Sequence, residues 1–502
     1  MNLNERKSLV LVTVDCLRAD HAGFMGYMRP TTPFLDGLAR ESLVFPKAVV
    51  TGVPTYYSFP GLMASRFPLA LGRDVIGIAP GEPTLATVLE QAGCRTAAFV
   101  AANPYLSARF GYAQGFQVFR ELLAEDAQRP DGGGERPEPT PRTRTRLNEQ
   151  VAELAHKFGP IGTLYDELYF QYCQRIAAPG NESWDRLRRY PSADVLVGES
   201  CDWLASLSGA PFFLWLHLMD PHAPYCPPAE ALKAMALAHL RPQRGRYLNA
   251  SWNRWDIGTW RLRAYRDEIV CLYDAGIRWV DLQMERLVEA LRRFSLWDSC
   301  VFVLTADHGE EFLDHGGRFH PPSQAYQEML RVPLLLRVPG VSRRPLADGP
   351  FSHIHVAPTI LEALGIGVPE EFEGRSCWSG VQTGESWELA ISESVSTCTS
   401  PWDCEKRLAG RALVVQDRRF KLVLDFDRDR EELFDLGNDP HEMRALPREA
   451  EKKTRARLLR AAFDHLTRQP QGSKAELALR ARVRQIGLEW SHSRIHAANQ
   501  AV

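Results

Sequence analysis

The sequence predicts an α/β protein built on a large, mostly parallel sheet, because three features recur along the chain. Short apolar runs rich in Val, Leu and Phe lack the alternation of half-exposed strands, which is typical of strands buried on both faces. Stretches with helical periodicity and capping residues separate these runs. Polar residues begin where the runs end, which is where ligands bind in open α/β sheets.

Strands and helices are expected to alternate along most of the chain. The predicted buried strands are 8–14, 44–50, 94–102, 211–218, 301–304 and 331–338. The predicted helices are 32–41, 84–93, 195–208, 263–294 and 355–365. Thr32 and Pro33 mark the start of the first helix, and Gly93 marks the end of the second. This alternation implies parallel strands joined by right-handed crossovers.

The chain is expected to divide into a main domain over residues 1–375, a C-terminal α+β subdomain over 376–448 and a basic helical tail over 449–502. Two strands of a small sheet are predicted at 388–394 and 412–425. The Arg-rich end is interpreted as a solvated helix face.

Three further stretches are irregular in composition. Residues 51–68 are rich in Pro and Gly and predict a loop that carries adjacent tyrosines, a Thr and a Ser. Residues 127–146 lack apolar periodicity and predict a flexible surface insertion. Residues 229–260 predict a second insertion, whose Trp252, Trp255 and Trp260 are better explained as a packing cluster than as the lining of a cleft.

Composition excludes several classes of protein. A net charge of −2 over 502 residues argues against a nucleic-acid-binding protein, whose footprint is basic. No apolar stretch approaches the length of a membrane span, and the apolar run near the N-terminus is too short for a signal peptide, so a cytoplasmic protein is expected. The ten cysteines form no C-x-x-C pair, which argues against a disulfide framework or a zinc site built on such pairs. The sequence gives no indication of the oligomeric state.

Four polar clusters follow predicted buried strands. They are Asp15, the segment Pro54–Phe59, the pair His217 and His222, and the pair Asp307 and His308. A single buried Asp at such a position is often a helix cap or an ion-pair partner. Four clusters at equivalent strand ends instead indicate a site, and an Asp beside a His suits a divalent metal ion. His315 and His320 follow in a glycine-containing loop that could fold back over the same point.

The order of these motifs resembles the sulfatase family of the alkaline phosphatase superfamily. The matching stretches are V-T-V-D-x-L-R-A-D-H, T-T-P-F-L-D, L-H-L-M-D-P-H-A-P-Y, T-A-D-H-G-E-E-F and L-R-V-P-L-L-L-R-V-P-G, followed by F-S-H-I-H-V-A-P-T-I-L-E-A-L-G and E-E-L-F-D-L-G-N-D-P-H-E. The resemblance spans roughly Ser8 to Leu446. It implies a large mixed, mostly parallel sheet flanked by helices, as in alkaline phosphatase, with a small C-terminal subdomain.

The resemblance also implies a metal-dependent hydrolase of sulfate or phosphate esters. Asp15, Asp307 and His308 match the ligands of one divalent metal ion, and His222 matches the histidine that contacts the ester and protonates the leaving oxygen. A divalent ion lowers the pKa of a bound hydroxyl and neutralises the transferred group, and a histidine is suited to supply the proton.

Further matches suggest residues that contact the substrate. His320 falls where such enzymes place a Lys or His that faces the anionic group, and His315 is a weaker candidate for the same task. Asn103 lies in a loop that supplies another polar contact, and His217 is a further candidate beside His222. The expected substrate is a small-molecule or glycan-linked ester.

Two departures from the family pattern bear on the chemistry. The family nucleophile is a Cys or Ser in C/S-x-P-S-R that is converted to formylglycine, whereas this chain has Thr55 there, and Tyr57 and Phe59 replace the Pro and Arg. Thr55 would act as an unmodified, metal-bound hydroxyl, with Ser58 as the alternative nucleophile. Cys16 replaces the second Asp of the metal site, which makes Mn²⁺ or Zn²⁺ as plausible as Ca²⁺.

The nucleophile widens the range of reactions. A threonine ester cannot collapse by elimination as the sulfated gem-diol of formylglycine does, so water or another acceptor must attack the transferred group directly. Sulfate and phosphate ester hydrolysis therefore both remain open. The alternatives are a phosphotransferase that acts on a glycan or lipid, like the phosphoglycerol and phosphoethanolamine transferases, and a non-catalytic relative.

Overall fold

The computed structural model of the chain describes residues 8–72, 75–101, 103–122, 154, 157, 160–176, 183–207, 209–322, 325–341, 348–383, 387–395 and 411–468. The expected insertion at 127–146 and the part of the tail beyond Arg468 lie outside these residues. Within them, no helix is both long and apolar enough to cross a lipid bilayer.

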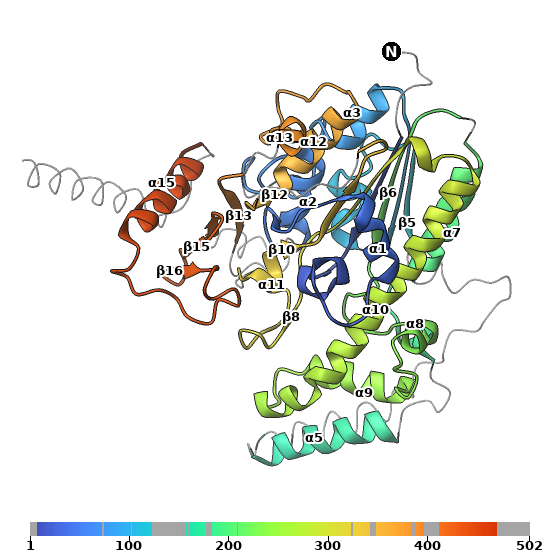
Figure 1. Cartoon of the computed structure of the whole chain (residues 1–502). Coiled ribbons are helices and arrows are strands. Elements are labelled where there is room, and N and C mark those ends of the chain that lie inside the picture. The colour runs from blue at the N-terminus through green and yellow to red at the C-terminus, as the bar shows by residue number, and fades with distance from the viewer. Residues whose placement is uncertain are drawn as a thin grey trace, which may run out of the picture.

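A seven-stranded mixed sheet forms the centre of the molecule (Figure 1). Its strands, in spatial order, are β2 (Leu43–Val44), β11 (Leu334–Arg337), β7 (Cys300–Ala306), β1 (Ser8–Val14), β6 (Phe212–Leu218), β4 (Arg95–Ala101) and β5 (Val118–Leu122). The four pairings from β7 to β5 are parallel, whereas β11 runs antiparallel to both β7 and β2. Every residue of β1, β6 and β7 is buried, as their unbroken apolar runs predicted.

Helices cover both faces of this sheet (Figure 1). On one face lie α1 (Pro33–Leu38), α7 (Ala193–Ala205) and the long helix α10 (Thr259–Arg293), which contacts the other two. On the other face lie α2 (Thr55–Ala64), α3 (Leu85–Gln91), α12 (Val356–Ala363) and α13 (Trp378–Thr383). This layered arrangement confirms the predicted fold class.

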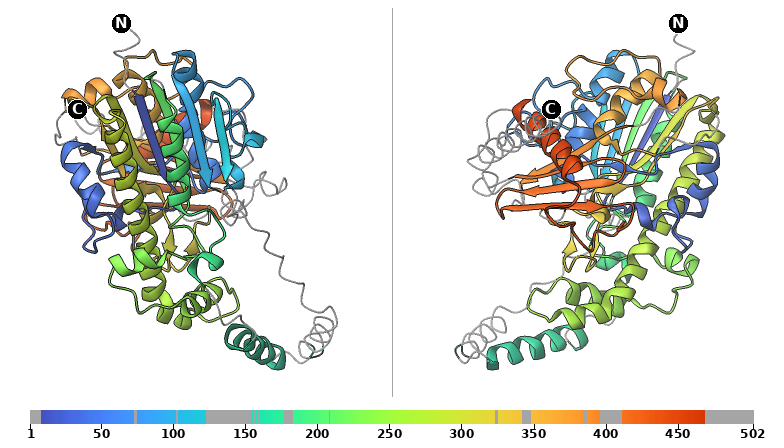
Figure 2. Two further views of the ribbon diagram at one scale, coloured as in Figure 1. Left: turned by 90° about the vertical axis from the view of Figure 1, so that its right-hand side faces the viewer. Right: turned by 60° about the vertical axis from the view of Figure 1, so that its left-hand side comes forward.

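An extension projects beyond the sheet along α10 (Figures 1 and 2). It contains α5 (Pro160–Arg175), α8 (Ala229–Ala234) and α9 (Pro242–Trp252), and α6 (Trp184–Leu187) contacts α9. Trp252 is buried in the core, in accord with a packing role, whereas Trp255 and Trp260 are each 77% exposed. The predicted tryptophan packing cluster is therefore wrong for two of its three members.

A four-stranded antiparallel sheet forms the C-terminal subdomain, which lies beside the main sheet (Figure 2). Its strands are β13 (Ala390–Val395), β14 (Arg411–Gln416), β15 (Phe420–Asp425) and β16 (Arg430–Asp435), and α15 (Lys452–Arg468) packs against β14 and β15. A separate apolar cluster joins this sheet to α15. The helix therefore belongs to the subdomain rather than to a detached tail.

Short elements complete the framework. They are β3 (Ala48–Val49), β10 (Arg331–Val332) and β12 (Phe351–Ser352) in one small sheet, the hairpin of β8 (Glu311–Phe312) and β9 (Arg318–Phe319), and the helix α11 (Gln327–Leu330). The predicted strands at 44–50 and 331–338 are thus each split between two sheets. The predicted loop at 51–68 contains α2, and this difference places Thr55 at the start of a helix.

Candidate functional site

The centre of the site lies where β1 and β7 end side by side. The strands are parallel, with Val14 paired to Ala306, so the next residues, Asp15 and Asp307, leave the sheet at the same point. Both carboxylates are fully buried. The sheet register thus brings together two acids that lie far apart in the sequence.

His308 lies beside both carboxylates with one nitrogen directed at them. Its Nε2 is 3.4 Å from Asp307 Oδ2 and 4.0 Å from Asp15 Oδ1. Its Nδ1 is 2.8 Å from the Gly309 carbonyl oxygen, and a carbonyl can only accept, so Nδ1 carries the proton and Nε2 has a free lone pair. Burial, reinforced by His320, lowers the pKa of His308 to about 4, which keeps the ring neutral.

The two carboxylates differ in their protonation. Burial and the charge of Asp15 raise the pKa of Asp307 to about 7. Burial also raises the pKa of Asp15, but the neighbouring His222, His217 and His308 outweigh it and hold that pKa well below its usual value. Among the described side chains, Asp307 Oδ2 has no hydrogen-bond partner. One atom each from Asp15, Asp307 and His308 lie within 4.8 Å of one another, so these residues could hold one metal ion.

Thr55 is the first residue of α2, and its side chain points to this cluster. Its Oγ1 is 3.2 Å from His308 Nε2, so the hydroxyl donates to the free lone pair. The N-terminus of a helix favours negative charge, which suits an anionic group bound at Thr55. Ser58, the alternative nucleophile, lies one turn further into α2, is fully buried and does not line the cavity in front of Thr55.

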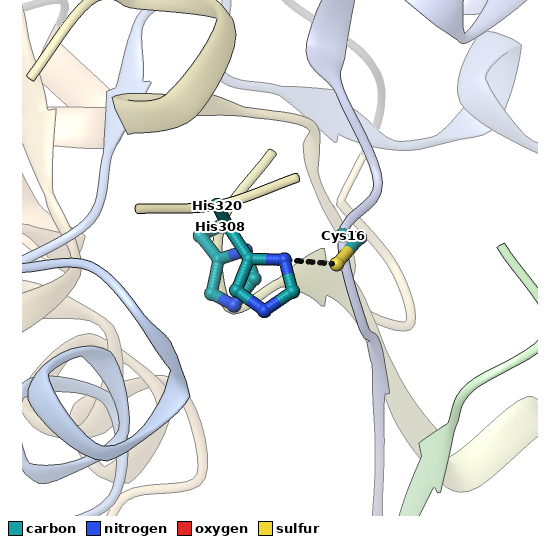
Figure 3. A group of neighbouring side chains, drawn as sticks. All are labelled: Cys16, His308 and His320. Carbon is teal, nitrogen blue, oxygen red and sulfur yellow. Dashed lines mark hydrogen bonds between the residues drawn. The ribbon is translucent and has the colours of Figure 1, made fainter. Parts of the chain in front are cut away.

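Cys16, which follows Asp15, reaches into the same cluster (Figure 3). Its Sγ is 3.0 Å from Asp15 Oδ1 and 3.5 Å from His320 Nδ1, and its backbone N–H donates to Asp307 Oδ1. Burial and the nearby carboxylates, Glu310 first, raise the pKa of Cys16, so the thiol is protonated and donates to Asp15. From the sequence, Cys16 was noted only because it replaces the second Asp of the family's metal site, and it was not predicted to contact the other site residues.

Two histidines stand in front of the cluster. The ring centroids of His222 and His320 lie 5.1 Å apart, and those of His320 and His308 lie 4.7 Å apart. Glu310 accepts hydrogen bonds from His320 Nδ1 and from the Tyr225 hydroxyl. Burial lowers the pKa of His320, but the Glu310 carboxylate outweighs it and the net shift is upward. Glu310 is a functional candidate that the sequence reading missed, although it belongs to the D-H-G-E motif.

Asn103 and His217 both contact Asp15. Asn103 lines the cavity and its Nδ2 donates to Asp15 Oδ2 at 3.0 Å. His217 lies behind Asp15, with Nε2 3.4 Å from Asp15 Oδ2 and Nδ1 2.9 Å from Thr13 Oγ1, and it is fully buried. His217 is not among the residues that line the cavity, so the structure places it behind Asp15 and the predicted contact of His217 with substrate stays a prediction.

His315 lies outside the site. Its Nδ1 is 2.6 Å from Glu328 Oε1, and its ring stacks on Tyr326 at 3.5 Å between centroids. The hairpin of β8 and β9 places His320 at the cavity but turns His315 toward the C-terminal subdomain. Its predicted substrate contact is corrected accordingly.

A cavity of about 550 Å³ opens in front of Thr55, Asn103, His222 and His320. Other lining residues were not assigned to a site from the sequence. Among them are Tyr105, Arg189, Trp255, Arg318 and Phe319 together with prolines, and we call this group the outer wall. Arg318 and Phe319 precede His320 directly, and this proximity was the only signal of their position that the sequence offered.

Known proteins resemble the chain over most of its length. Residues 7–366 match the family described as Sulfatase, and residues 317–469 match the one described as N-sulphoglucosamine sulphohydrolase, C-terminal. An arylsulfatase of Clostridium perfringens is 23% identical over 493 residues, which cover 91% of this chain and 93% of that protein. An endo-4-O-sulfatase of Bacteroides thetaiotaomicron is 25% identical over 264 residues, half of each chain.

Solved structures of related enzymes share the fold. The crystal structure of a phosphonate monoester hydrolase of Agrobacterium radiobacter superposes with a TM-score of 0.61 at 19% identity, covering 95% of this chain and 96% of that one. At this identity the likeness establishes the fold. Together with the family match over residues 7–366, it identifies the chain as a member of the sulfatase family of the alkaline phosphatase superfamily and hence as a sulfuric ester hydrolase.

Proposed function

We propose that this enzyme hydrolyses sulfate or phosphate-type monoesters with Thr55 as an unmodified nucleophile. The observation that carries the proposal is the position of the Thr55 hydroxyl, 3.2 Å from His308 Nε2 at the floor of the cavity. A hydroxyl at a helix N-terminus, beside two carboxylates and a neutral imidazole, has the surroundings that activate an alcohol toward an ester.

The residues around Thr55 fit a divalent metal ion. Asp15, Asp307 and His308 would hold it, with Thr55 completing the set, because the neutral ring offers a lone pair and one oxygen of Asp307 lacks a partner among the described side chains. When bound, such an ion would lower the pKa of the Thr55 hydroxyl and neutralise charge on the transferred group. The donor set of two carboxylates, the Thr55 hydroxyl and an imidazole nitrogen suits Mn²⁺ or Zn²⁺ as well as Ca²⁺.

The proposed reaction has two steps, each with a proton transfer at the reacting oxygens. Thr55 Oγ1 forms a bond to sulfur or phosphorus and loses its proton to solvent, while the bond to the leaving oxygen breaks and His222 protonates that oxygen. Water then attacks the Thr55 ester, gives its proton to His222 and releases the inorganic anion, and the Thr55 oxygen regains a proton from solvent. Asn103 and His320 would orient the anionic group, since both line the cavity beside Thr55.

Transfer to a glycan or lipid is not favoured, because the relatives described above are named as hydrolases. The choice between sulfate and phosphate-type esters is open, since one relative is named a sulfatase and the other acts on phosphonate monoesters. The enzyme is expected to act in solution on a small-molecule or glycan-linked ester.

The test combines a substrate screen with trapping of the intermediate. Aryl sulfate, phosphate mono- and diester and phosphonate are assayed with Mn²⁺, Ca²⁺ or Zn²⁺, with product analysis in the presence and absence of a glycan acceptor. Thr55→Ala should lower kcat by more than about 10³-fold, whereas Ser58→Ala should keep the wild-type rate. Mass spectrometry of acid-quenched enzyme should locate the sulfuryl or phosphoryl group on Thr55.

Three outcomes would contradict the proposal. Full activity in Thr55→Ala would remove Thr55 from the mechanism, and a modified peptide containing Ser58 would reassign the nucleophile. An enzyme that is inert with every ester and metal would be a non-catalytic relative.

A further inference from the structure

Arg318 is a buried cation that faces the cavity without a carboxylate partner. It lies on β9, is only 5% exposed and lines the cavity that contains Thr55. Its guanidinium donates to the backbone carbonyl of Trp252 and lies 4.4 Å from the centre of the Trp255 ring. No carboxylate of the described residues forms an ion pair with it, and burial lowers its pKa.

The other buried arginines of the described chain do not share this property. Arg18 pairs with Asp20 and Asp314, Arg66 with Glu82, Arg411 with Glu393, and Arg455 with Glu431. All of these arginines are at most 7% exposed. Because a buried charge is costly unless it is paired, the lack of a carboxylate partner among the described residues leaves room for an anionic group of the substrate beside Arg318.

The side chains that line the cavity include basic groups but no acidic ones, although the carboxylates of Asp15, Asp307 and Glu310 lie buried behind them. The basic groups are Arg189, Arg318, His222 and His320. This contrasts with a net charge of −2 for the chain as a whole. The reacting ester group accounts for the histidines beside Thr55, but it leaves Arg318 at the outer wall without a counterpart.

Trp255 adds a second feature to the outer wall. Trp255 is 77% exposed and lines the cavity, and the Arg318 guanidinium lies over its ring. An exposed tryptophan in a cavity suits the face of a sugar or aryl ring, and the planar guanidinium suits an anionic group with paired oxygens.

We propose that Arg318 and Trp255 form a subsite for a second anionic group, a carboxylate or a sulfate, on the leaving-group part of the substrate. The inference deepens the proposed function, and it depends on that function only in taking the cavity at Thr55 as the place of reaction. It narrows the substrate to esters of a ring that carries another negative charge.

The test compares phenyl esters that differ only at the meta position, which carries a carboxylate, a second sulfate or a neutral carboxamide. Wild-type enzyme should prefer each anionic ester over the carboxamide by about 10–100-fold in kcat/KM, the worth of one charge-assisted hydrogen bond. In Arg318→Met, which keeps an apolar stem, the preference should fall to about twofold or less, mainly through KM. Circular dichroism and thermal unfolding check the fold of Arg318→Met independently of activity, and the ratio to the carboxamide ester isolates the effect of the charge.

Arg254→Met is the matched control. Arg254 also stacks on an aromatic ring, that of Phe170 at 4.5 Å, but it pairs with Glu167 and does not line the cavity, so the preference should persist. If Arg318→Met fails to fold, Arg318→Lys keeps the charge but loses the paired donors and should show a reduced preference.

The outcomes are decisive in either direction. A wild-type preference near one, or a preference that survives in Arg318→Met or is undiminished in Arg318→Lys, overturns the inference. Preference for only one of the two anionic esters supports it and identifies the group. If no ester is turned over, the proposed function fails, and calorimetric binding of the same esters to wild type and Arg318→Met still decides on the subsite.

Discussion

The loop that carries His315 and His320 joins two buried charged clusters that differ in whether their charges cancel. We call Asp15, Asp307, His308, Glu310 and His320 the strand-end cluster. The subdomain cluster consists of His315, Glu328, Lys421 and Glu442. In the subdomain cluster every group has an opposite partner, with Lys421 Nζ 2.6 Å from Glu442 Oε1 and His315 Nδ1 2.6 Å from Glu328 Oε1.

The strand-end cluster has an excess of negative charge instead. Asp15 and Asp307 face each other in full burial, and the neutral His308 ring between them offers a lone pair rather than a charge. Only Glu310 is matched, by His320. A buried cluster whose charges cancel can serve structure alone, whereas one with surplus carboxylates is stable only with a proton or a cation. This difference separates a functional cluster from a structural one.

The largest effect is expected for Asp307→Asn. Activity should fall by at least about 10³-fold, because removing a metal ligand removes charge stabilisation worth several kcal/mol. The metal-free variant should nevertheless unfold at a higher temperature than wild type, since a repulsion between buried carboxylates is gone. Kinetics, elemental analysis and thermal unfolding with a chelator measure these effects.

Asp435→Asn is the control for that experiment. Asp435 pairs with Arg419 in the C-terminal subdomain, remote from the cavity, so metal content and activity should be unchanged. Equal metal content in Asp307→Asn and wild type would show that the carboxylate excess is not a metal site.

In the subdomain cluster, Lys421→Met should lower the stability and leave the activity unchanged, the opposite of what is expected for Asp307→Asn. The Glu442 carboxylate would remain buried without its cation, which costs about 3–5 kcal/mol of unfolding free energy. The double variant Lys421→Met/Glu442→Gln should recover most of this loss, because no unpaired charge remains. Urea unfolding measures the stability, and the folded single variant should keep its kcat; a selective loss of kcat would place this cluster in the catalytic machinery.

How far the sequence predicts these clusters depends on the range of the interactions. The run before Asp15 and the run before Asp307 predicted buried strands, and parallel pairing then requires their ends to meet. Thr55 and Ser58 could not be separated without knowing that their segment is helical. Ser58 then lies about 4.5 Å deeper along the axis of α2.

The two loop histidines illustrate what a sequence leaves open. The local sequences differ, D-H-G around His315 and F-H-P around His320, but neither shows which ring faces the cavity. The partners that decide their positions, Glu328 and Glu310, lie on opposite sides of the β8–β9 hairpin. Likewise, the exposure of Trp255 and the missing partner of Arg318 arise from tertiary packing.

Glu310→Gln tests the one matched pair of the strand-end cluster. The amide retains the shape and can still accept from Tyr225, but it no longer holds a charge beside His320. We expect kcat/KM to fall by about 10–100-fold, the usual cost of losing a residue that positions a catalytic-site histidine. Tyr225→Phe, which leaves the carboxylate in place, should cost less than tenfold, about 1 kcal/mol for one hydrogen bond. An equal loss in both variants would indicate that packing, not charge, orients His320.

The smallest effect is expected for His315→Gln and depends on pH. Burial lowers the pKa of His315, but the hydrogen bond and charge of Glu328 outweigh it, so the folded pKa lies above the usual 6.5. The folded chain therefore binds this proton more tightly than the unfolded chain. The resulting stabilisation is complete below pH 6.5 and is lost as the pH rises through the folded pKa.

In urea unfolding, the free energy of unfolding of wild type should exceed that of His315→Gln by about 0.5–1 kcal/mol at acidic pH. The difference should disappear above neutral pH. His441→Gln, at an exposed position of the C-terminal subdomain, is the control for replacing a histidine by glutamine. A gap that stays constant or widens with pH would mean that stacking on Tyr326, rather than the ion pair with Glu328, holds this side of the loop.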